Sequence, residues 1–222
     1  MLEKKMTNRQ ARAVETRKKI LKAAKVLIAG KGFEGTSIDD IAKAAGVSTG
    51  SFYTYFKKKE DVVEELSKTD FYRLAEIVNG MENKDILDRL RYYCGHFLGG
   101  IEETGIEICR QWIRNNLAPN SMFPGGEAIT KYQYDYRAMQ SILHEAVHRG
   151  ELKAGAPVDD LALFINAQLY GLMVAWCMTD GQVKGSEKTG ALCETVVHAA
   201  LAPFRQSVSF QGGNSSGICN AE

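Results

Sequence analysis

Residues with side chains suited to chemistry crowd positions 48 to 59, where hydroxyl groups precede a run of lysines. The hydroxyls are those of Ser48, Thr49, Ser51, Tyr53, Thr54 and Tyr55, and the cations are Lys57, Lys58 and Lys59. Hydroxyl groups donate hydrogen bonds to phosphate oxygens, and neighbouring cations add a salt-sensitive attraction to a polyanion. An ordinary helical hairpin with a solvated lysine run carries similar residues, so the elements that position these side chains decide between the two interpretations.

The stretch just before the hydroxyls predicts a short helix that ends in a tight turn. Its apolar residues have the i, i+3, i+4, i+7 spacing of one buried helical face, at Ile38, Ile41, Ala42 and Ala45. Ser37 is suited to cap this helix, and Asp40 three positions later completes a variant of the capping box. Gly46 ends the helix because glycine adopts the left-handed conformation at almost no steric cost.

A second helix is predicted over residues 49–56, with Ser48 as its cap. Phe52 and Phe56 lie one turn apart and point inward, so Gly50 points outward with hydroxyls on its flanks. A small residue on the outer face allows the helix backbone to approach a groove closely. Two helices, a tight turn and this outer face within about two dozen residues favour a helix-turn-helix that reads DNA.

Residues 15–63 strongly resemble the TetR family of bacterial repressors, without a gap. The resemblance rests on Thr16-Arg17, Ile20-Leu21, Ala23-Ala24, Gly32-Phe33, Thr36-Ser37-Ile38, Ile41-Ala42, Ala45-Gly46-Val47-Ser48, Gly50, Phe52-Tyr53, Tyr55-Phe56 and Lys59-Glu60. It implies an all-α, dimeric, ligand-responsive repressor whose partner is double-stranded operator DNA. The DNA contacts that it implies come from Thr36, Ser37, Ser48, Thr49, Gly50, Ser51, Tyr53, Tyr55 and Lys59.

One position departs from the family pattern. Many members carry a basic or polar base-reading residue where this chain has Asp39. A carboxylate cannot contact phosphate, although it can accept a hydrogen bond from a cytosine amino group.

Charge is divided unevenly along the 222 residues, although the net charge is only +1. Residues 1–60 hold 14 Lys and Arg against 6 Asp and Glu, whereas the rest of the chain holds 14 against 21. A basic N-terminal third beside an acidic remainder fits a DNA-binding head on a body that does not touch DNA. We therefore expect a DNA-binding domain over 1–60, an effector-binding and dimerisation domain over 61–205, and a disordered tail over 206–222.

Cysteine usage and hydropathy predict a cytoplasmic protein without a membrane segment. The five cysteines are odd in number and form no C-x-x-C pair, which suits reduced thiols. Residues 1–12 lack the apolar core of a signal peptide and are expected to form a mobile arm. The most apolar stretch, residues 161–178, is short for a membrane span and carries Asn166 and Gln168 at its centre, which favours a helix buried in an interface.

Hydrophobic periodicity predicts nine helices and no strands. Their expected ranges are 14–29, 38–45, 49–56, 59–79, 83–98, 101–117, 127–149, 157–179 and 186–204. The helix over 59–79 is expected to run unbroken from head to body, and residues 119–126 form the longest turn-rich loop.

A different chemistry is suggested by His144-Glu145-Ala146-Val147-His148, which fits the H-E-x-x-H pattern of zinc hydrolases. Two histidines one helical turn apart can share a zinc ion, with the glutamate as general base. The metzincin continuation is absent, however, because Glu151 and Ala154 stand where Gly and His belong. We therefore expect no catalytic residue, no metal site and no cofactor, and keep a zinc-dependent hydrolase as an alternative.

The family resemblance implies an effector pocket in the body, where most of the aromatic residues lie. Plain core packing accounts for most of these rings. Tyr93, His96 and Trp112 are the candidates for pocket lining, since each combines an apolar body with a polar tip. A DNA-binding protein without an effector is the second alternative.

A homodimer is predicted from the helix over 157–179, which is apolar on more than one stripe. Its candidate interface residues are Leu161, Phe164, Ile165, Leu169, Leu172 and Trp176. A two-fold dimer buries such a face and presents two recognition helices to a palindromic operator.

Overall fold

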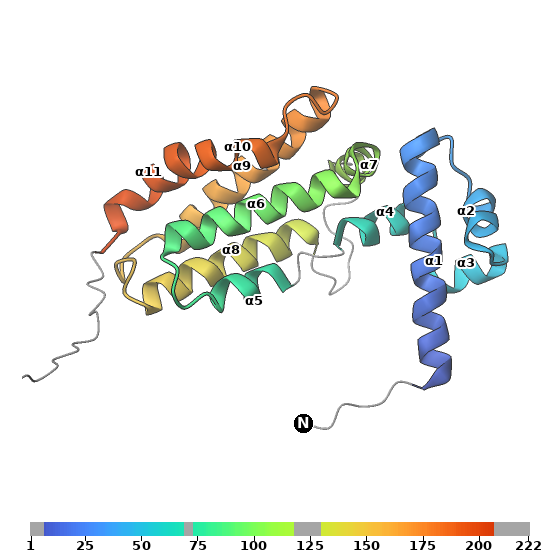
Figure 1. The fold of residues 1–222 in the computed structure, drawn as a ribbon, viewed down its shortest axis with the longest axis horizontal. Helices are drawn as coiled ribbons and strands as arrows, with labels where there is room; N and C mark the ends of the chain where they lie inside the picture. Colours follow the sequence, from blue (N-terminus) through green and yellow to red (C-terminus); the bar gives the residue numbers. More distant parts are fainter. Residues whose placement is uncertain (1–6, 69–72, 118–129, 207–222) are drawn as a thin grey trace, which may run out of the picture.

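The computed structural model describes residues 7–68, 73–117 and 130–206, and within these ranges it is all-α, as predicted. Figure 1 shows a small head at one end, made of α1 (Asn8–Lys31), α2 (Ile38–Ala45) and α3 (Thr49–Tyr55), and a larger body whose helices run across the direction of α1. The predicted loop over 119–126 lies outside the described residues, as does the predicted tail apart from Gln206.

The body contains the remaining elements. These are α4 (Lys59–Lys68), α5 (Leu74–Asn79), α6 (Ile86–Thr104), α7 (Ile106–Leu117), α8 (Lys131–His148), α9 (Val158–Met178), α10 (Gly185–Leu192) and α11 (His198–Leu201). A π-helical turn, Cys193–Val197, joins α10 to α11, and a 3-10 turn, Ala202–Phe204, follows. An isolated antiparallel bridge pairs Leu152 with Arg205 and fastens the end of this last helical run to the α8–α9 connection.

The head forms as its local sequence predicts. The side chain of Ser37 accepts from the backbone N–H of Asp40, whose carboxylate in turn accepts from the N–H of Ser37, so the capping box is complete. Gly46 ends α2 with φ of 68°, the left-handed conformation that favours glycine. Ile41, Phe52 and Phe56 are buried against α1, and this small core holds α3 in a fixed orientation.

Helix α1 begins earlier than the sequence analysis expects. Thr7 caps it with a capping box to Gln10, so residues 8–12 are helical and do not belong to a mobile arm. The expectation was wrong because it weighed the polar character of this stretch and overlooked the Thr7–Gln10 pattern, which supplies two of the unpaired N–H groups at the helix start with acceptors.

Two helices replace the single helix expected over 59–79. Helix α4 has the bounds Lys59–Lys68, and α5 starts anew at Leu74 after Arg73; residues 69–72 lie outside the described part of the chain.

The boundary predicted at Gly99 and Gly100 also differs. Helix α6 continues through both glycines and ends at Gly105, where φ is 106°. A left-handed φ marks a true break, whereas glycines with helical dihedrals do not.

Helix α4 joins the head to the body through packing on both sides, against α1 and against α7. An ion pair between Arg17 of α1 and Glu65 of α4, 2.5 Å between Nη1 and Oε1, adds to this contact.

Helix α9 packs against α6, α7, α8 and α10. Cys94, Cys109, Cys177 and Cys193 are buried free thiols.

Candidate DNA interface and effector site

The outer face of α3 is held outward by the two phenylalanines beneath it. Phe52 and Phe56 are 0% and 3% exposed and their ring centroids lie 5.7 Å apart. Ser48 caps the helix, because its hydroxyl oxygen accepts from the N–H of Ser51 at 3.1 Å. Tyr53 packs edge-on against Phe52 yet remains 53% exposed, so its hydroxyl is presented to solvent on a rigid ring.

Gly50 leaves bare backbone at the surface of α3. It has ordinary helical geometry, and an added Cβ would meet only the Ser48 hydroxyl, at 3.9 Å. Nothing inside the protein therefore requires glycine at this position. A missing side chain on an exposed helical face is useful when another molecule must approach the backbone closely.

Thr49 and Asp39 are joined across the turn. The hydroxyl of Thr49 donates to Oδ1 of Asp39 at 2.7 Å, and Asp39 is exposed on α2. In the sequence alone, Asp39 stands out only as a departure from the family pattern. The hydrogen bond gives it a second role, since it orients the Thr49 side chain.

Thr36 and Lys59 lie deeper than the other candidate DNA contacts. Thr36 is fully buried, and its hydroxyl donates to the carbonyl of Gly32 at 2.8 Å. The Lys59 ammonium donates to the carbonyls of Phe33 and Thr36 at 2.6 and 2.7 Å, and lies 4.0 Å from the centre of the Phe33 ring. Both side chains therefore fasten the turn between α1 and α2 to the start of α4.

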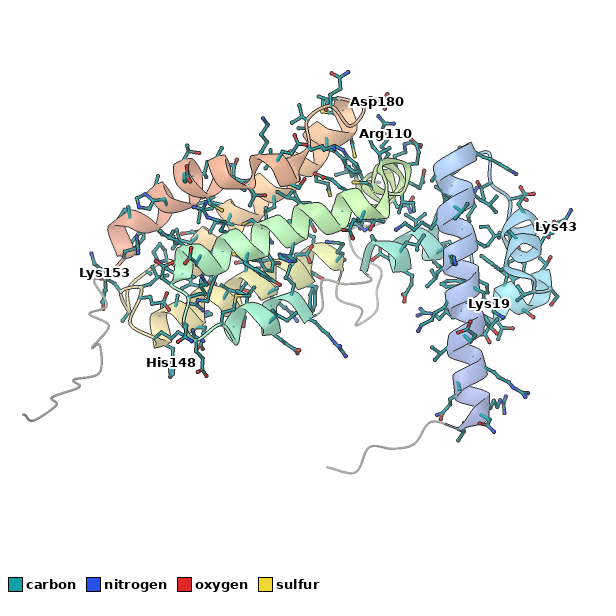
Figure 2. All side chains as sticks on the ribbon, viewed as in Figure 1. Lys19, Lys43, Arg110, His148, Lys153 and Asp180 are labelled. Atoms are coloured by element: carbon teal, nitrogen blue, oxygen red, sulfur yellow. The ribbon has the colours of Figure 1, made fainter. Side chains whose placement is uncertain are left out.

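Exposed cations surround this face. Lys57 and Lys58 are exposed, and their backbone N–H groups donate to the carboxylate of Asp61. Lys43 is exposed on α2, and Figure 2 shows it on the side of the head away from the body. Lys43 was missed by the sequence analysis, although a lysine on the polar face of the first helix of the motif was a usable signal.

The three candidate effector residues are not brought together. Tyr93 is 1% and Trp112 is 6% exposed, both in the interior of the body. His96 is exposed, stacks on Tyr92 with centroids 3.8 Å apart, and has its Nδ1 2.9 Å from the Tyr92 carbonyl. His96 faces a surface groove of about 940 Å³ between α5 and α6, which neither Tyr93 nor Trp112 lines.

Trp112 lines a different cavity, of about 690 Å³, between α7, α8 and α9. Most of its lining is apolar, which suits a drug-sized molecule. The lining residues are Trp112, Ile113, Asn116, Leu117, Thr130, Tyr132, Gln133, Tyr170, Gly171, Met173 and Val174. Of the three candidates, Trp112 alone belongs to it.

A buried polar cluster adjoins this cavity, and the sequence analysis missed it. Lys131 and Asp135, one turn apart on α8, form an ion pair at 5% and 0% exposure. The hydroxyl of Tyr170 donates to Oδ2 of Asp135 at 2.7 Å. Burial raises the pKa of Asp135 above its ordinary value, against the opposing effect of Lys131. The i, i+4 spacing of a lysine and an aspartate among aromatic residues was the available signal.

Trp112 also connects the cavity to the head. Its indole N–H donates to Oε2 of Glu64 in α4 at 3.1 Å. Helix α4 also packs against α1, and α7 itself contacts α1, so Trp112 lies where the body meets the head.

The histidines of the H-E-x-x-H pattern, His144 and His148, are both exposed on α8; Figure 2 shows His148 at the end of the body remote from the head. Glu145 accepts from Nε of Arg149 at 2.8 Å, and this bond lowers the pKa of Glu145. Within the described residues no three metal-ligating side chains come together.

The candidate dimer residues divide into two sets. Leu161, Ile165, Leu169 and Trp176 are at most 7% exposed and pack inside the chain. Phe164 is 58% exposed and Leu172 is partly exposed. The first four belong to the body core because α9 turns one face toward α6, α7 and α8.

By length and composition α9 is also apolar enough to cross a membrane, but it is the core helix of a compact body.

Comparison with known proteins agrees with this geometry. Residues 20–66 match the family model for bacterial regulatory proteins, tetR family. The HTH-type transcriptional regulator AcrR of Shigella flexneri is 28% identical over 173 residues, which are 74% of this chain and 79% of that protein. The fatty acid metabolism regulator protein of Bacillus subtilis is 28% identical over 170 residues, which are 72% and 83% of the two chains.

Solved structures share the fold. SmeT, the repressor of the Stenotrophomonas maltophilia multidrug efflux pump SmeDEF, superposes with a TM-score of 0.61 at 20% identity, covering 93% of this chain and 100% of that chain. A complex of SmeT with triclosan gives a TM-score of 0.60 at 21% identity, covering 93% and 99% of the two chains. Because these relatives are regulators, the zinc-hydrolase alternative is not favoured. Residues 20–66 thus match the tetR family of bacterial regulatory proteins, and most of the chain is similar to regulators that carry this domain.

Proposed function

We propose that this chain is a DNA-binding transcriptional repressor that acts in the cytoplasm as a homodimer and leaves a palindromic operator when a small molecule binds its body. The observation that carries the proposal is the outer face of α3, where bare backbone at Gly50 is flanked by exposed hydroxyls and held out by two buried rings. That combination has no use inside the protein and matches what a DNA groove requires.

The DNA contacts divide by chemistry. Thr49 and Gly50 face base edges, because they stand at the start of the recognition helix. Phosphate contacts come from hydroxyls and N–H groups of Ser37, Ser48, Ser51, Tyr53 and Tyr55. Thr36 was expected among them, but it is fully buried and its hydroxyl donates to the Gly32 carbonyl, so its role is to hold the turn. Lys59 contributes through the third N–H of its ammonium, since carbonyls take the other two.

The homodimer is formed by the exposed side of α9 and the helical run that follows it. Leu163, Phe164, Val174 and Met178 are 42%, 58%, 36% and 81% exposed on α9, and Val196 is 37% exposed in the π-helical turn. Exposed large apolar side chains gathered on one face mark an interaction surface. A two-fold axis beside α9 leaves both heads free to meet half-sites roughly 34–36 Å apart.

The effector site is the cavity of about 690 Å³ between α7, α8 and α9. SmeT, which shares the fold, has been solved in complex with triclosan, and this supports a small-molecule effector for this chain as well. Binding acts on the operator through the Trp112–Glu64 hydrogen bond and α4. A ligand changes DNA affinity only if it prefers one arrangement of these helices over another.

Selection of binding sites from random double-stranded DNA by the purified protein tests the proposed function. We expect enrichment of an inverted repeat whose half-site centres lie about one helical turn apart. Replacing Gly50 by Val should abolish the enrichment while the fold, followed by circular dichroism, stays intact. Recovery of unrelated sequences, or of a single half-site, would contradict the proposal.

A further inference from the structure

The ammonium group of Lys131 lies in a box of aromatic rings. Its Nζ is 4.7 Å from the ring centre of Phe97, 5.7 Å from that of Tyr170 and 5.9 Å from that of Trp112. Aromatic faces attract cations, and boxes of this kind with a carboxylate nearby are how proteins recognise ammonium groups. The carboxylate here is that of Asp135, which pairs with the same Nζ.

Lys131 is an unusual occupant of such a box. It is the first residue of α8, where the positive end of the helix dipole disfavours a cation. The box must therefore offset that cost as well as the burial of a charge.

The carboxylate side of the box has more hydrogen-bonding capacity than Lys131 uses. Oδ1 of Asp135 is buried and has no hydrogen-bond partner within the described part of the chain. Asn166 lies one turn before Tyr170 on α9. Both polar atoms of its side chain are likewise buried and have no hydrogen-bond partner among the described residues. Buried polar atoms are normally satisfied, so these atoms mark a polar patch in the interior of the body on the Asp135 side of the box.

The box and the larger cavity share a wall. Lys131, Trp112 and Met173 line a narrow space of about 20 Å³, and both Trp112 and Met173 also line the cavity of about 690 Å³. Tyr170 belongs to the box and to the large cavity at once. The box therefore lies directly behind the side chains of Trp112, Tyr170 and Met173 that line the large cavity.

We propose that the cavity takes an organic cation, whose ammonium group replaces that of Lys131 beside Asp135 while its apolar part fills the space between α7, α8 and α9. Lys131 holds the site in the absence of this molecule, as a tethered competitor. The ligand thus belongs to the class of amines and quaternary ammonium compounds with an apolar body. Its action as an effector rests on the proposed function, whereas its binding does not.

Isothermal titration calorimetry without DNA tests the proposal with three probes of similar length. These are 4-phenylbutyltrimethylammonium, the neutral alcohol 5-phenylpentan-1-ol and the carboxylate 5-phenylpentanoate. The ammonium probe should bind at least about tenfold more tightly than either of the others. Tighter binding of the carboxylate probe, abolished by Lys131→Met, would overturn the proposal and make Lys131 an anion site.

Two variants separate a role in binding from a role in folding. Lys131→Met removes the competing ammonium and should tighten the ammonium probe about tenfold or more, whereas Lys188→Met, at an exposed position of α10, should change nothing. The double variant Lys131→Met, Asp135→Asn has uncharged side chains at both positions. It should therefore bind the ammonium probe no more tightly than the parent does. Melting temperatures report whether each variant is folded. No gain in the folded single variant would refute the tethered-competitor account.

These calorimetric results are independent of the operator. An ammonium probe that fails to bind overturns the cation site and leaves the proposed repressor function standing. A probe that binds tightly but leaves operator affinity unchanged supports the site and contradicts its use as an effector site.

Discussion

The hydroxyl of Thr49 donates to the carboxylate of Asp39 across 2.7 Å, joining the two helices of the DNA-reading motif at their outer surface. The acid here holds a proposed base-reading side chain in one orientation, and it also brings a negative charge toward the phosphates. Specificity and overall affinity are therefore opposed at this position.

Replacing Asp39 separates these two effects. Asp39→Asn keeps an oxygen acceptor for Thr49 and removes the charge, so binding to all sequences should strengthen by about 0.5–1 kcal/mol at low salt. Asp39→Ala also frees Thr49 and should in addition relax the base preference at one position of each half-site. Anisotropy titrations with operator and random DNA measure both quantities. Equal behaviour of the two variants would show that the hydrogen bond does not influence base choice.

Lys59 should matter more for stability than for DNA affinity. Lys59→Met breaks charged hydrogen bonds to two carbonyls and should lower the free energy of unfolding by about 2–3 kcal/mol. Lys58→Met, at an exposed neighbour, is the matched control and should leave stability unchanged while lowering the salt slope of DNA binding by about one. Urea unfolding and salt titrations distinguish them. The interpretation fails if the two variants lose stability equally.

A charge at Phe164 should dissociate the dimer. Phe164 is 58% exposed on α9, so Phe164→Glu should not disturb the core but should place two carboxylates at the proposed two-fold interface. Sedimentation velocity at micromolar concentration should show a monomer for this variant and a dimer for the parent. Arg137→Glu, exposed on α8, serves as the control for a change of charge alone. A dimer that survives Phe164→Glu would place the interface elsewhere.

The capping box of α2 should make the head sensitive to acid. Hydrogen bonds from Ser37, first from its backbone and then from its side chain, lower the pKa of Asp40, with help from Lys31. A carboxylate whose pKa is lower in the folded state stabilises the fold above its unfolded pKa, and this contribution is lost as the pH falls through about 4 toward the folded value. The Asp40→Asn variant should therefore have a lower melting temperature than the parent at pH 7, with the difference shrinking on acidification. A difference independent of pH would contradict this.

Much of the head could be predicted from the sequence because its signals are local. The motif is specified by residues close together in the chain. Ser37 caps α2 together with Asp40 three positions later, Gly46 ends it with φ of 68°, and Phe52 and Phe56 lie one turn apart on α3. The predicted start of α1 was wrong although its signal was strong. The Thr7–Gln10 capping box is visible in the sequence, but the polar character of the stretch was given more weight.

The body could be predicted only in outline, because its sites are built from contacts between distant residues. Asp135 and Tyr170 stand 35 positions apart, and Trp112 and Glu64 stand 48 apart, so no spacing rule joins them. Likewise, hydrophobic pattern shows that α9 is apolar nearly all round but not which face the body covers. Leu169 thus lies in the core, whereas Phe164, five residues earlier and on another side of the helix, lies at the surface.

The Trp112–Glu64 hydrogen bond should carry the coupling between body and head. Glu64→Ala removes the acceptor outside the cavity, so binding of an ammonium probe and of operator DNA, measured separately, should be nearly normal. The coupling free energy between probe binding and operator binding should fall by about 0.5–2 kcal/mol. Calorimetry with and without operator measures this coupling directly. Full coupling in the variant would exclude this route.

The most direct test is the dissociation constant for the selected operator, measured by anisotropy with and without saturating 4-phenylbutyltrimethylammonium. If a cation in the body cavity and DNA on the head favour different arrangements of α4, the constant should rise roughly 5- to 150-fold, and the operator should weaken probe binding by the same factor. An operator affinity that stays the same while the probe occupies its site would contradict the account.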